Sequence, residues 1–129
     1  MSTLFSKIVK GEIEAFKILE DEKHLAFLDV FPLKPGHTLV IPKKEEDYIF
    51  DMPDEELAEL MIFAKVVSKK LKKAFPCKKI GVAVIGLEVP HTHIHLIPLE
   101  KVSDINFENS KLKMESSELA EIASLISNA

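Results

Sequence analysis

Three histidines at alternate positions, His91, His93 and His95, constrain this chain more than any other feature of its sequence. They open a stretch over residues 91–99 that is typical of a strand, and successive side chains of a strand point to opposite faces. All three imidazoles are therefore expected on one face, roughly 6.6 Å apart along the strand at ~3.3 Å of rise per residue. The opposite face would carry Thr92, Ile94 and Leu96.

Two kinds of chemistry suit such a row of imidazoles. Alternate histidines on a strand can share one metal ion such as zinc, and a catalytic zinc held by three histidines needs no carboxylate ligand. In the other interpretation, one neutral imidazole attacks phosphorus and holds a phosphoryl group covalently, which splits a displacement into two steps. The flanking histidines would then bond to phosphate oxygens and set the tautomer of the nucleophile. The spacing alone leaves both interpretations open.

The remaining sequence predicts a single α+β domain over residues 1–129. An acidic, proline-containing start at Asp51–Glu56 predicts a long helix that ends near Phe75, before Pro76. Strands before and after this helix favour an antiparallel sheet of about five strands with helices packed on it. The other expected elements are helices over 3–10 and 117–127 and strands over 13–19, 24–30, 38–41, 80–85 and 91–99. The long helix should bury Leu57, Leu60, Met61, Ala64, Val67 and Leu71.

Composition favours a cytoplasmic protein without nucleic-acid or membrane partners. The chain has 17 basic against 21 acidic residues, and this net charge of −4 argues against a general nucleic-acid binder. Its longest uncharged apolar run, Ile80 to Leu87, is far shorter than the ~20 residues of a membrane-spanning helix. Cys77 is the only cysteine, so no internal disulfide is possible, which fits a reducing cytosol. Residues 1–11 lack the apolar core of a signal peptide.

The run from His91 to Ile97, His-Thr-His-Ile-His-Leu-Ile, resembles the signature of the histidine triad (HIT) family. Two further blocks are similar to the same family, Phe5–Ile13 and Ala26–Lys44. The three blocks follow the family's order and spacing and together extend over about residues 3–99. The tail over residues 100–129 matches no motif of that family.

The resemblance implies a homodimer, with no metal or other cofactor, that binds purine nucleotides and cleaves the bond between a nucleoside α-phosphate and its leaving group. His93 matches the nucleophile, which becomes transiently nucleotidylated. His91, His95 and His37 match the histidines that hold the phosphate and one another. Asp29 matches a carboxylate that accepts hydrogen bonds from the ribose hydroxyls. The apolar residues that match the surroundings of the base and sugar are Phe5, Ile8, Ile13, Phe27, Leu28 and Val30.

Several positions depart from the family pattern. Thr3 and Ser6 stand where members often carry cysteines that bind a structural zinc, so the resemblance predicts no such zinc here. Leu87 and Glu88 stand where a glutamine and a hydroxyl residue usually precede the first histidine. The Leu87 side chain cannot hydrogen-bond, and Glu88 would repel a phosphate unless it contacts a cationic leaving group. His24 has no matched role and is expected at the surface.

The sequence therefore predicts a hydrolase of purine nucleoside 5′-phosphate derivatives, with a phosphoramidate as the preferred substrate and Glu88 facing its amine. Three alternatives remain: a dinucleoside polyphosphate hydrolase, a nucleotide-binding dimer with vestigial catalysis, and a metal-binding protein that uses His91, His93 and His95. Ile62, Phe63 and Val66 broaden the apolar stripe of the long helix, which fits a helix buried on two sides.

Overall fold

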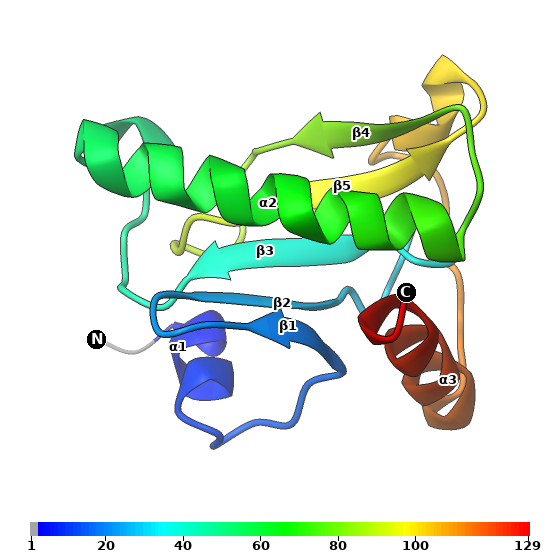
Figure 1. Ribbon diagram of the computed structural model, residues 1–129, viewed down its shortest axis with the longest axis horizontal. Helices are drawn as coiled ribbons and strands as arrows, with labels where there is room; N and C mark the ends of the chain where they lie inside the picture. The colour runs from blue at the N-terminus through cyan, green and yellow to red at the C-terminus, as the bar shows by residue number, and fades with distance from the viewer. Residues whose placement is uncertain (1–2) are drawn as a thin grey trace.

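A five-stranded antiparallel sheet, with the strand order β1-β2-β3-β5-β4, organises the chain (Figure 1). The structure is a computed structural model that describes residues 3–129. Each pair of neighbouring strands runs antiparallel, which confirms the sheet predicted from the sequence. The strands are β1 (Lys17–Glu20), β2 (His24–Leu28), β3 (Thr38–Pro42), β4 (Lys79–Ala83) and β5 (Ile94–Leu99).

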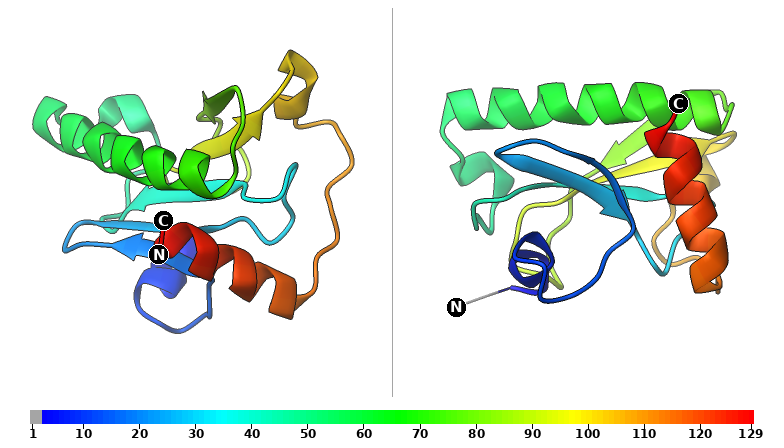
Figure 2. Two further views of the ribbon diagram at one scale, coloured as in Figure 1. Left: turned by 45° about the vertical axis from the view of Figure 1, so that its right-hand side comes forward. Right: turned by 60° about the horizontal axis from the view of Figure 1, so that its bottom comes forward.

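Helices cover both faces of this sheet. The long helix α2 (Asp54–Ala74) and the closing helix α3 (Ser116–Ser127) pack on one face, and the short helix α1 (Leu4–Val9) packs on the other (Figure 2). Side chains therefore divide into two apolar clusters, one on each side of the central strands. The larger cluster contains Ile94 and Leu96 of β5, so the residues that alternate with the histidines lie in the core, as predicted.

Helix α2 begins at Asp54, three residues later than the sequence suggests. The preceding residues Ile49–Asp51 form a short 3₁₀ turn, and Met52 is extended with ψ 140° because it stands before Pro53. Acidic side chains fill the first turn and lysines the last turn, in agreement with the helix dipole. The buried positions of α2 are Leu60, Phe63, Ala64, Val67 and Leu71.

Two details of the predicted burial differ from the structure. Met61 is 42% exposed, because it follows Leu60 by one residue and so lies outside the stripe of α2 that faces the sheet. Leu57, also predicted to be buried, packs against the core but is only partly buried. Within residues 3–129, no helix is long and apolar enough to cross a membrane.

The last strand begins at Ile94, not at His91, so the prediction of a strand over 91–99 is wrong at its start. The backbone N–H of Thr92 donates to the carbonyl oxygen of Glu46 at 2.6 Å, and the Thr92 hydroxyl donates to the same oxygen at 2.7 Å. The N–H of His91 bonds locally to the oxygen of Val89. These bonds replace the sheet ladder, and β5 starts only after His93.

Candidate active site

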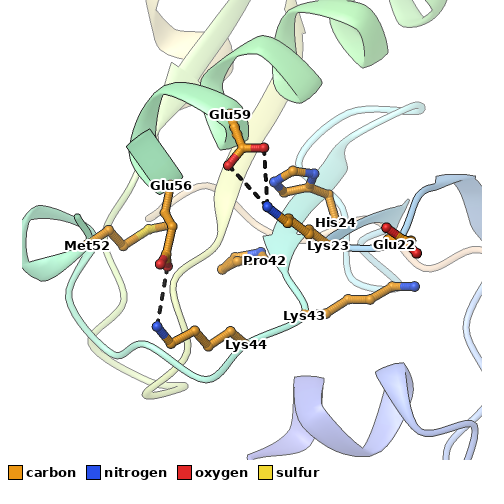
Figure 3. A pocket seen from close by; sticks show the side chains of 9 residues that line it. All are labelled: Glu22, Lys23, His24, Pro42, Lys43, Lys44, Met52, Glu56 and Glu59. Atoms are coloured by element: carbon orange, nitrogen blue, oxygen red, sulfur yellow. Dashed lines mark hydrogen bonds and ion pairs between the residues drawn. The ribbon is translucent and has the colours of Figure 1, made fainter. Parts of the chain in front are cut away.

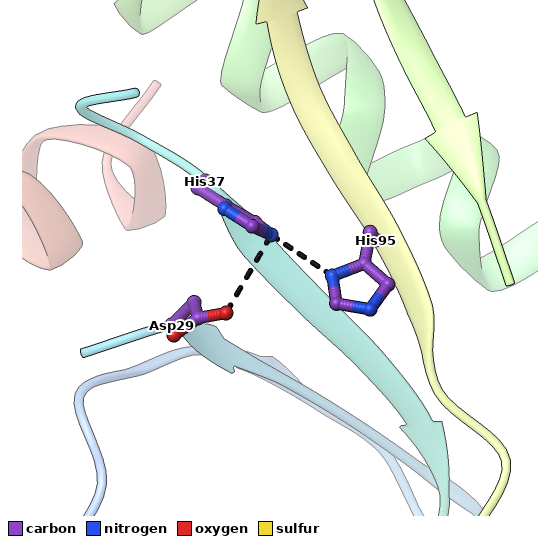
Figure 4. Close-up of side chains that lie close together, drawn as sticks. All are labelled: Asp29, His37 and His95. Atoms are coloured by element: carbon purple, nitrogen blue, oxygen red, sulfur yellow. Dashed lines mark hydrogen bonds and ion pairs between the residues drawn. The ribbon is translucent and has the colours of Figure 1, made fainter. Parts of the chain in front are cut away.

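His37 and His95 meet at the centre of the sheet, on the side that α1 covers (Figure 4). His37 lies immediately before β3, and His95 pairs in register with Leu39, a member of the apolar cluster under α1. His37 Nε2 is 2.9 Å from His95 Nδ1 and 3.6 Å from the carboxylate oxygen Oδ2 of Asp29. The two histidines and the carboxylate expected from the sequence are therefore brought together.

The hydrogen bonds of these two rings define their tautomers. The backbone N–H of Leu33 donates to His37 Nδ1 at 3.0 Å, so the proton of the neutral His37 ring is on Nε2. His37 Nε2 then donates to His95 Nδ1, which leaves the proton of His95 on its own Nε2. The chain of bonds thus presents an N–H group of His95 as a donor.

Burial keeps both rings uncharged at neutral pH. Desolvation lowers the pKa of His37 to about 4, and the nearby Lys111 charge acts in the same direction. Desolvation likewise lowers the pKa of His95 to about 3, assisted by His37, His93 and Lys111. Neutral imidazoles can donate to a phosphate oxygen without a prior change of protonation state.

His93 is oriented by the backbone. Its Nδ1 atom lies 2.7 Å from the carbonyl oxygen of His91 and must donate to it, so Nε2 carries the free lone pair. The ring packs edge-on against Phe5, with centroids 4.9 Å apart, and against His95 at 5.0 Å. His93 is thus held in the tautomer that a nitrogen nucleophile needs.

His91 has a different environment from the other histidines. Its Nε2 atom donates to the carbonyl oxygen of Pro42 at 2.8 Å, and its Nδ1 atom lies 2.9 Å from the Thr3 hydroxyl. The side chain is fully buried, and both ring nitrogens are engaged. The ring also contacts Phe5, so all three alternating rings lie on the α1 side of the sheet, as predicted.

This arrangement does not support the metal interpretation that uses His91, His93 and His95, because the ring nitrogens of His91 are turned to Pro42 and Thr3. Among residues 3–129, the group of potential ligands that could share one ion is Asp29, His37 and His95, whose ligand atoms lie within 4.8 Å of one another. Two of those atoms already form the hydrogen bond between the two imidazoles.

A chain of hydroxyl groups joins His91 to the start of α1. The Thr3 side chain accepts a hydrogen bond from the Ser6 N–H at 2.9 Å and caps the helix. The Ser6 hydroxyl donates to the Glu45 carboxylate, and the Thr3 N–H donates to the same oxygen at 3.2 Å. Thr3 and Ser6, which stand at the cysteine positions of the family pattern, here connect α1 to His91 and to the segment after β3.

A cavity of about 240 Å³ opens beside His37, His93 and His95. Glu88 lines it, as expected from the sequence, and so does Asp29, whose Oδ1 accepts the Phe31 N–H at 2.9 Å. Burial raises the pKa of Asp29 above its usual range. The other residues that line the cavity are Ile85, Gly86, Leu87, Phe107 and Lys111.

The apolar residues expected around a nucleoside do not all reach one place. Phe5, Ile8 and Phe27 are buried in the cluster under α1, next to His93. Ile8 and the partly exposed Ile13 line a second hollow of about 360 Å³, and Val30 is exposed. The expectation for Leu28 is wrong, because its side chain lies in the core on the α2 side of the sheet. The alternation of β2 directs Phe27 and Leu28 to opposite faces.

His24 is buried instead of lying at the surface as expected. Its ring stacks on Phe63 with centroids 5.0 Å apart, and its Nδ1 atom is 3.0 Å from Asp21. It borders a hollow of about 270 Å³ beside the first turns of α2 (Figure 3). Across this hollow Lys23 pairs with Glu59 and Lys44 pairs with Glu56, so these charges neutralise one another.

Phe107 and Lys111 were not anticipated by the sequence reasoning. They belong to the segment between β5 and α3, and they reach the histidines from positions 12 and 16 residues beyond His95. No local pattern marks either residue, since an aromatic side chain and a lysine in a polar stretch are ordinary at a protein surface. Only the tertiary path of the segment places them in the cavity.

Comparisons with known proteins cover the part of the chain that carries these histidines. A model of the HIT domain family matches residues 10–102, which include His37 and the three alternating histidines. An uncharacterized HIT-like protein of Borreliella burgdorferi is 35% identical over 132 residues, which cover 96% of this chain and 95% of that relative. An adenosine 5′-monophosphoramidase of Saccharomyces cerevisiae is 40% identical over 96 residues, which cover 74% of this chain and 61% of the yeast protein. The crystal structure of a Hit-like protein from Bartonella henselae superimposes with a TM-score of 0.86 at 32% identity, covering 98% of this chain and 95% of that one.

Proposed function

The chain belongs to the HIT domain family, and from this premise we propose that it hydrolyses purine nucleoside 5′-phosphoramidates through a nucleotidyl intermediate on His93. The observation that carries the proposal is the hydrogen bond from His93 Nδ1 to the His91 carbonyl oxygen at 2.7 Å. It leaves the Nε2 lone pair of His93 available to attack phosphorus. The similarity to an adenosine 5′-monophosphoramidase of Saccharomyces cerevisiae supports this choice of substrate class.

In the proposed reaction, His93 Nε2 forms a bond to the α-phosphorus while the bond from phosphorus to the leaving nitrogen breaks. The leaving amine takes up a proton from solvent. A water molecule then attacks the phosphorus and returns a proton to solvent, which releases the nucleoside monophosphate and regenerates His93. The N–H of His95, directed by its bond from His37, would donate to the phosphate as negative charge develops. Glu88 lines the same cavity and suits an amine leaving group better than a polyphosphate.

The nucleoside would lie between Asp29 and α1. Two carboxylate oxygens match the pair of ribose hydroxyls, and Asp29 is placed beside His37 with one oxygen 3.6 Å from its ring. Phe5 contacts both His93 and the apolar cluster of Ile8 and Phe27, so an apolar surface continues from the nucleophile toward α1. Such a surface suits a purine ring.

We further propose that two copies of the chain form a homodimer, in the cytoplasm. The edge strand β4, the two residues after it and the outer side of α2 expose a group of apolar side chains: Met61, Ile62, Val66, Val82, Val84 and Ile85. Exposed apolar groups beside an unpaired strand edge are typical of a surface that another chain covers. Ile85 also lines the histidine cavity, so this surface is continuous with the site.

Turnover of adenosine 5′-monophosphoramidate by the purified protein tests the proposal. We expect turnover that a chelator does not affect, that the His93→Ala variant abolishes, and that gives a nucleotide adduct on His93 in rapidly quenched samples. AMP binding by His93→Ala serves as the control that the site is still folded. No turnover by the wild-type protein, with AMP bound normally, would support the binding protein with vestigial catalysis. Loss of activity on chelation would support a metal enzyme.

A further inference from the structure

Hydrogen bonds fix the segment after β5 at both of its ends. At its start, the Asp104 carboxylate accepts hydrogen bonds from two backbone N–H groups, at 2.8 and 3.0 Å. Further along, the Leu112 N–H donates to the carbonyl oxygen of Pro32 at 2.8 Å, in the loop that follows Asp29. The residues between these anchors therefore have a defined position beside the site.

Phe107 contacts the catalytic histidines directly. Its ring packs edge-to-face on His95, with centroids 4.7 Å apart at 73°, and on His37 at 6.1 Å and 80°. The same residue positions a lysine, because Lys111 Nζ donates to the Phe107 carbonyl oxygen at 2.7 Å and lies 5.8 Å from the ring centroid. Lys111 is thereby presented to the cavity, which it lines.

The charges around the cavity are unfavourable for a phosphate without Lys111. Asp29 and Glu88 contribute carboxyl groups, while His37 and His95 are neutral at pH 7 because burial lowers their pKa values to about 4 and 3. The chain contains no arginine, and Lys111 is the one lysine among the residues that line this cavity. A nucleotide phosphate would thus meet a single permanent cation.

We propose that Lys111 is the phosphate-binding cation of this site, and that its ammonium group donates to a non-bridging oxygen of the nucleotide α-phosphate. The inference rests on the proposed function and names a residue of the C-terminal segment as part of it. Lys111 Nζ lies 2.7 Å from the carbonyl oxygen of Phe107 and 3.5 Å from that of Asn109, and because an ammonium group has three donors, one remains for the ligand. The contact would contribute to binding of every nucleotide that carries this phosphate.

Calorimetric titration of the full chain with AMP and with adenosine tests the inference. We expect Lys111→Gln to weaken AMP binding about tenfold, as for loss of one partly exposed charged hydrogen bond, and to leave adenosine binding unchanged. Lys113→Gln is the matched control, because Lys113 is exposed two residues away and does not line the cavity. Added salt should weaken AMP binding by the wild type more than by Lys111→Gln.

The two proposals fail in different ways. The role of Lys111 is overturned if the AMP affinity of Lys111→Gln is within about twofold of the wild type, or if its affinities for AMP and adenosine fall equally. Either result leaves the proposed turnover of the phosphoramidate intact. An equal loss of AMP affinity in Lys113→Gln would also overturn it, since a general effect of charge would then explain the result. If the wild type neither binds AMP nor turns over the phosphoramidate, the proposed function fails, and the inference fails with it.

Discussion

The Nδ1 atom of His93 lies 2.7 Å from the main-chain oxygen of His91, so the proposed nucleophile is oriented by the backbone of its neighbour and not by a side chain. That backbone is itself held, because the His91 ring is anchored to Pro42 on one side and to Thr3 on the other. A residue whose ring does not line the cavity thereby determines which nitrogen of His93 carries the free lone pair. In the proposed reaction, His91 therefore positions His93.

Thr3 is the first test of this arrangement. Its hydroxyl caps α1 and contacts His91 Nδ1, so Thr3→Val removes both interactions while keeping the shape of the side chain. We expect the free energy of unfolding to fall by about 1–3 kcal/mol, the combined effect of a lost cap and a buried ring nitrogen without its partner. Urea denaturation at pH 7 measures the change, and the kcat of the same variant should fall several-fold while its KM is retained.

Thr3→Ser is the matched control, because serine keeps the hydroxyl and caps a helix equally well. It should be close to the wild type in both stability and kcat. If Thr3→Val were as stable and as active as Thr3→Ser, the hydroxyl chain from α1 to His91 would have no part in positioning the nucleophile.

His95 supplies the second prediction. With Nδ1 bonded to His37, its remaining N–H is a donor toward the phosphate, so His95→Ala should remove stabilisation of the transition state. We expect kcat to fall by about 10²- to 10⁴-fold, and AMP affinity to change much less. Steady-state kinetics together with AMP titration separate the two effects. A variant that kept kcat within about tenfold of the wild type would exclude His95 from the chemical step.

Acid sensitivity follows from the buried imidazoles. Burial lowers the folded-state pKa of His37 to about 4, whereas the unfolded ring titrates near 6.5, so the unfolded state binds more protons between these values. Stability is complete above pH 6.5 and falls as the pH decreases toward 4. For His37 alone the loss between pH 7 and pH 5 is roughly 2 kcal/mol, and His91 and His95, whose pKa values burial also lowers, add to it in the same direction.

Urea denaturation at a series of pH values from 7 to 5 measures how steeply the free energy of unfolding changes with pH. In that range the carboxyl groups with lowered pKa values remain ionised, while Asp29, whose pKa burial raises, contributes with the opposite sign. His37→Asn, which offers an acceptor to the Leu33 N–H without a titrating ring, should show a shallower slope. An identical slope in this variant would mean that His37 is not protonated on unfolding.

How far the sequence predicts this molecule depends on the range of the interactions involved. The fold and the meeting of His37, Asp29 and His95 were predictable, because each lies in a block whose order and spacing match one family. The side of the sheet on which Leu28 lies was not predictable, because β2 is buried on both sides and its run of apolar residues shows no alternation with polar ones. The late start of β5 at Ile94 depends on hydrogen bonds from Thr92 to Glu46, which lies 46 residues earlier in the chain. No local sequence pattern predicts such bonds.

The C-terminal segment shows the same limit in the site itself. Phe107 and Lys111 reach the histidines because the chain is fixed on either side of them. Asp104 accepts two hydrogen bonds from nearby backbone N–H groups, and the Leu112 N–H donates to the oxygen of Pro32, 80 residues earlier. Sequence spacing relates residues within one element, whereas this contact joins a loop to β5 across the fold. The sequence alone therefore does not indicate that Lys111 lies in the histidine cavity.

The exposed apolar surface of α2 and β4 gives the last prediction. Ile62 is 64% exposed and Val82 55% exposed, and both would become buried in the proposed homodimer. A glutamate at position 62 would be buried without a partner in each copy, so Ile62→Glu should weaken the dimer by about 10²-fold or more. Light scattering coupled to size exclusion should then report a dimeric wild type and a monomeric variant. Leu125→Glu on α3, where the replaced side chain is 54% exposed, is the control and should remain dimeric. A monomeric wild type, or equal dissociation of both variants, would contradict the assignment of this surface to a second copy of the chain.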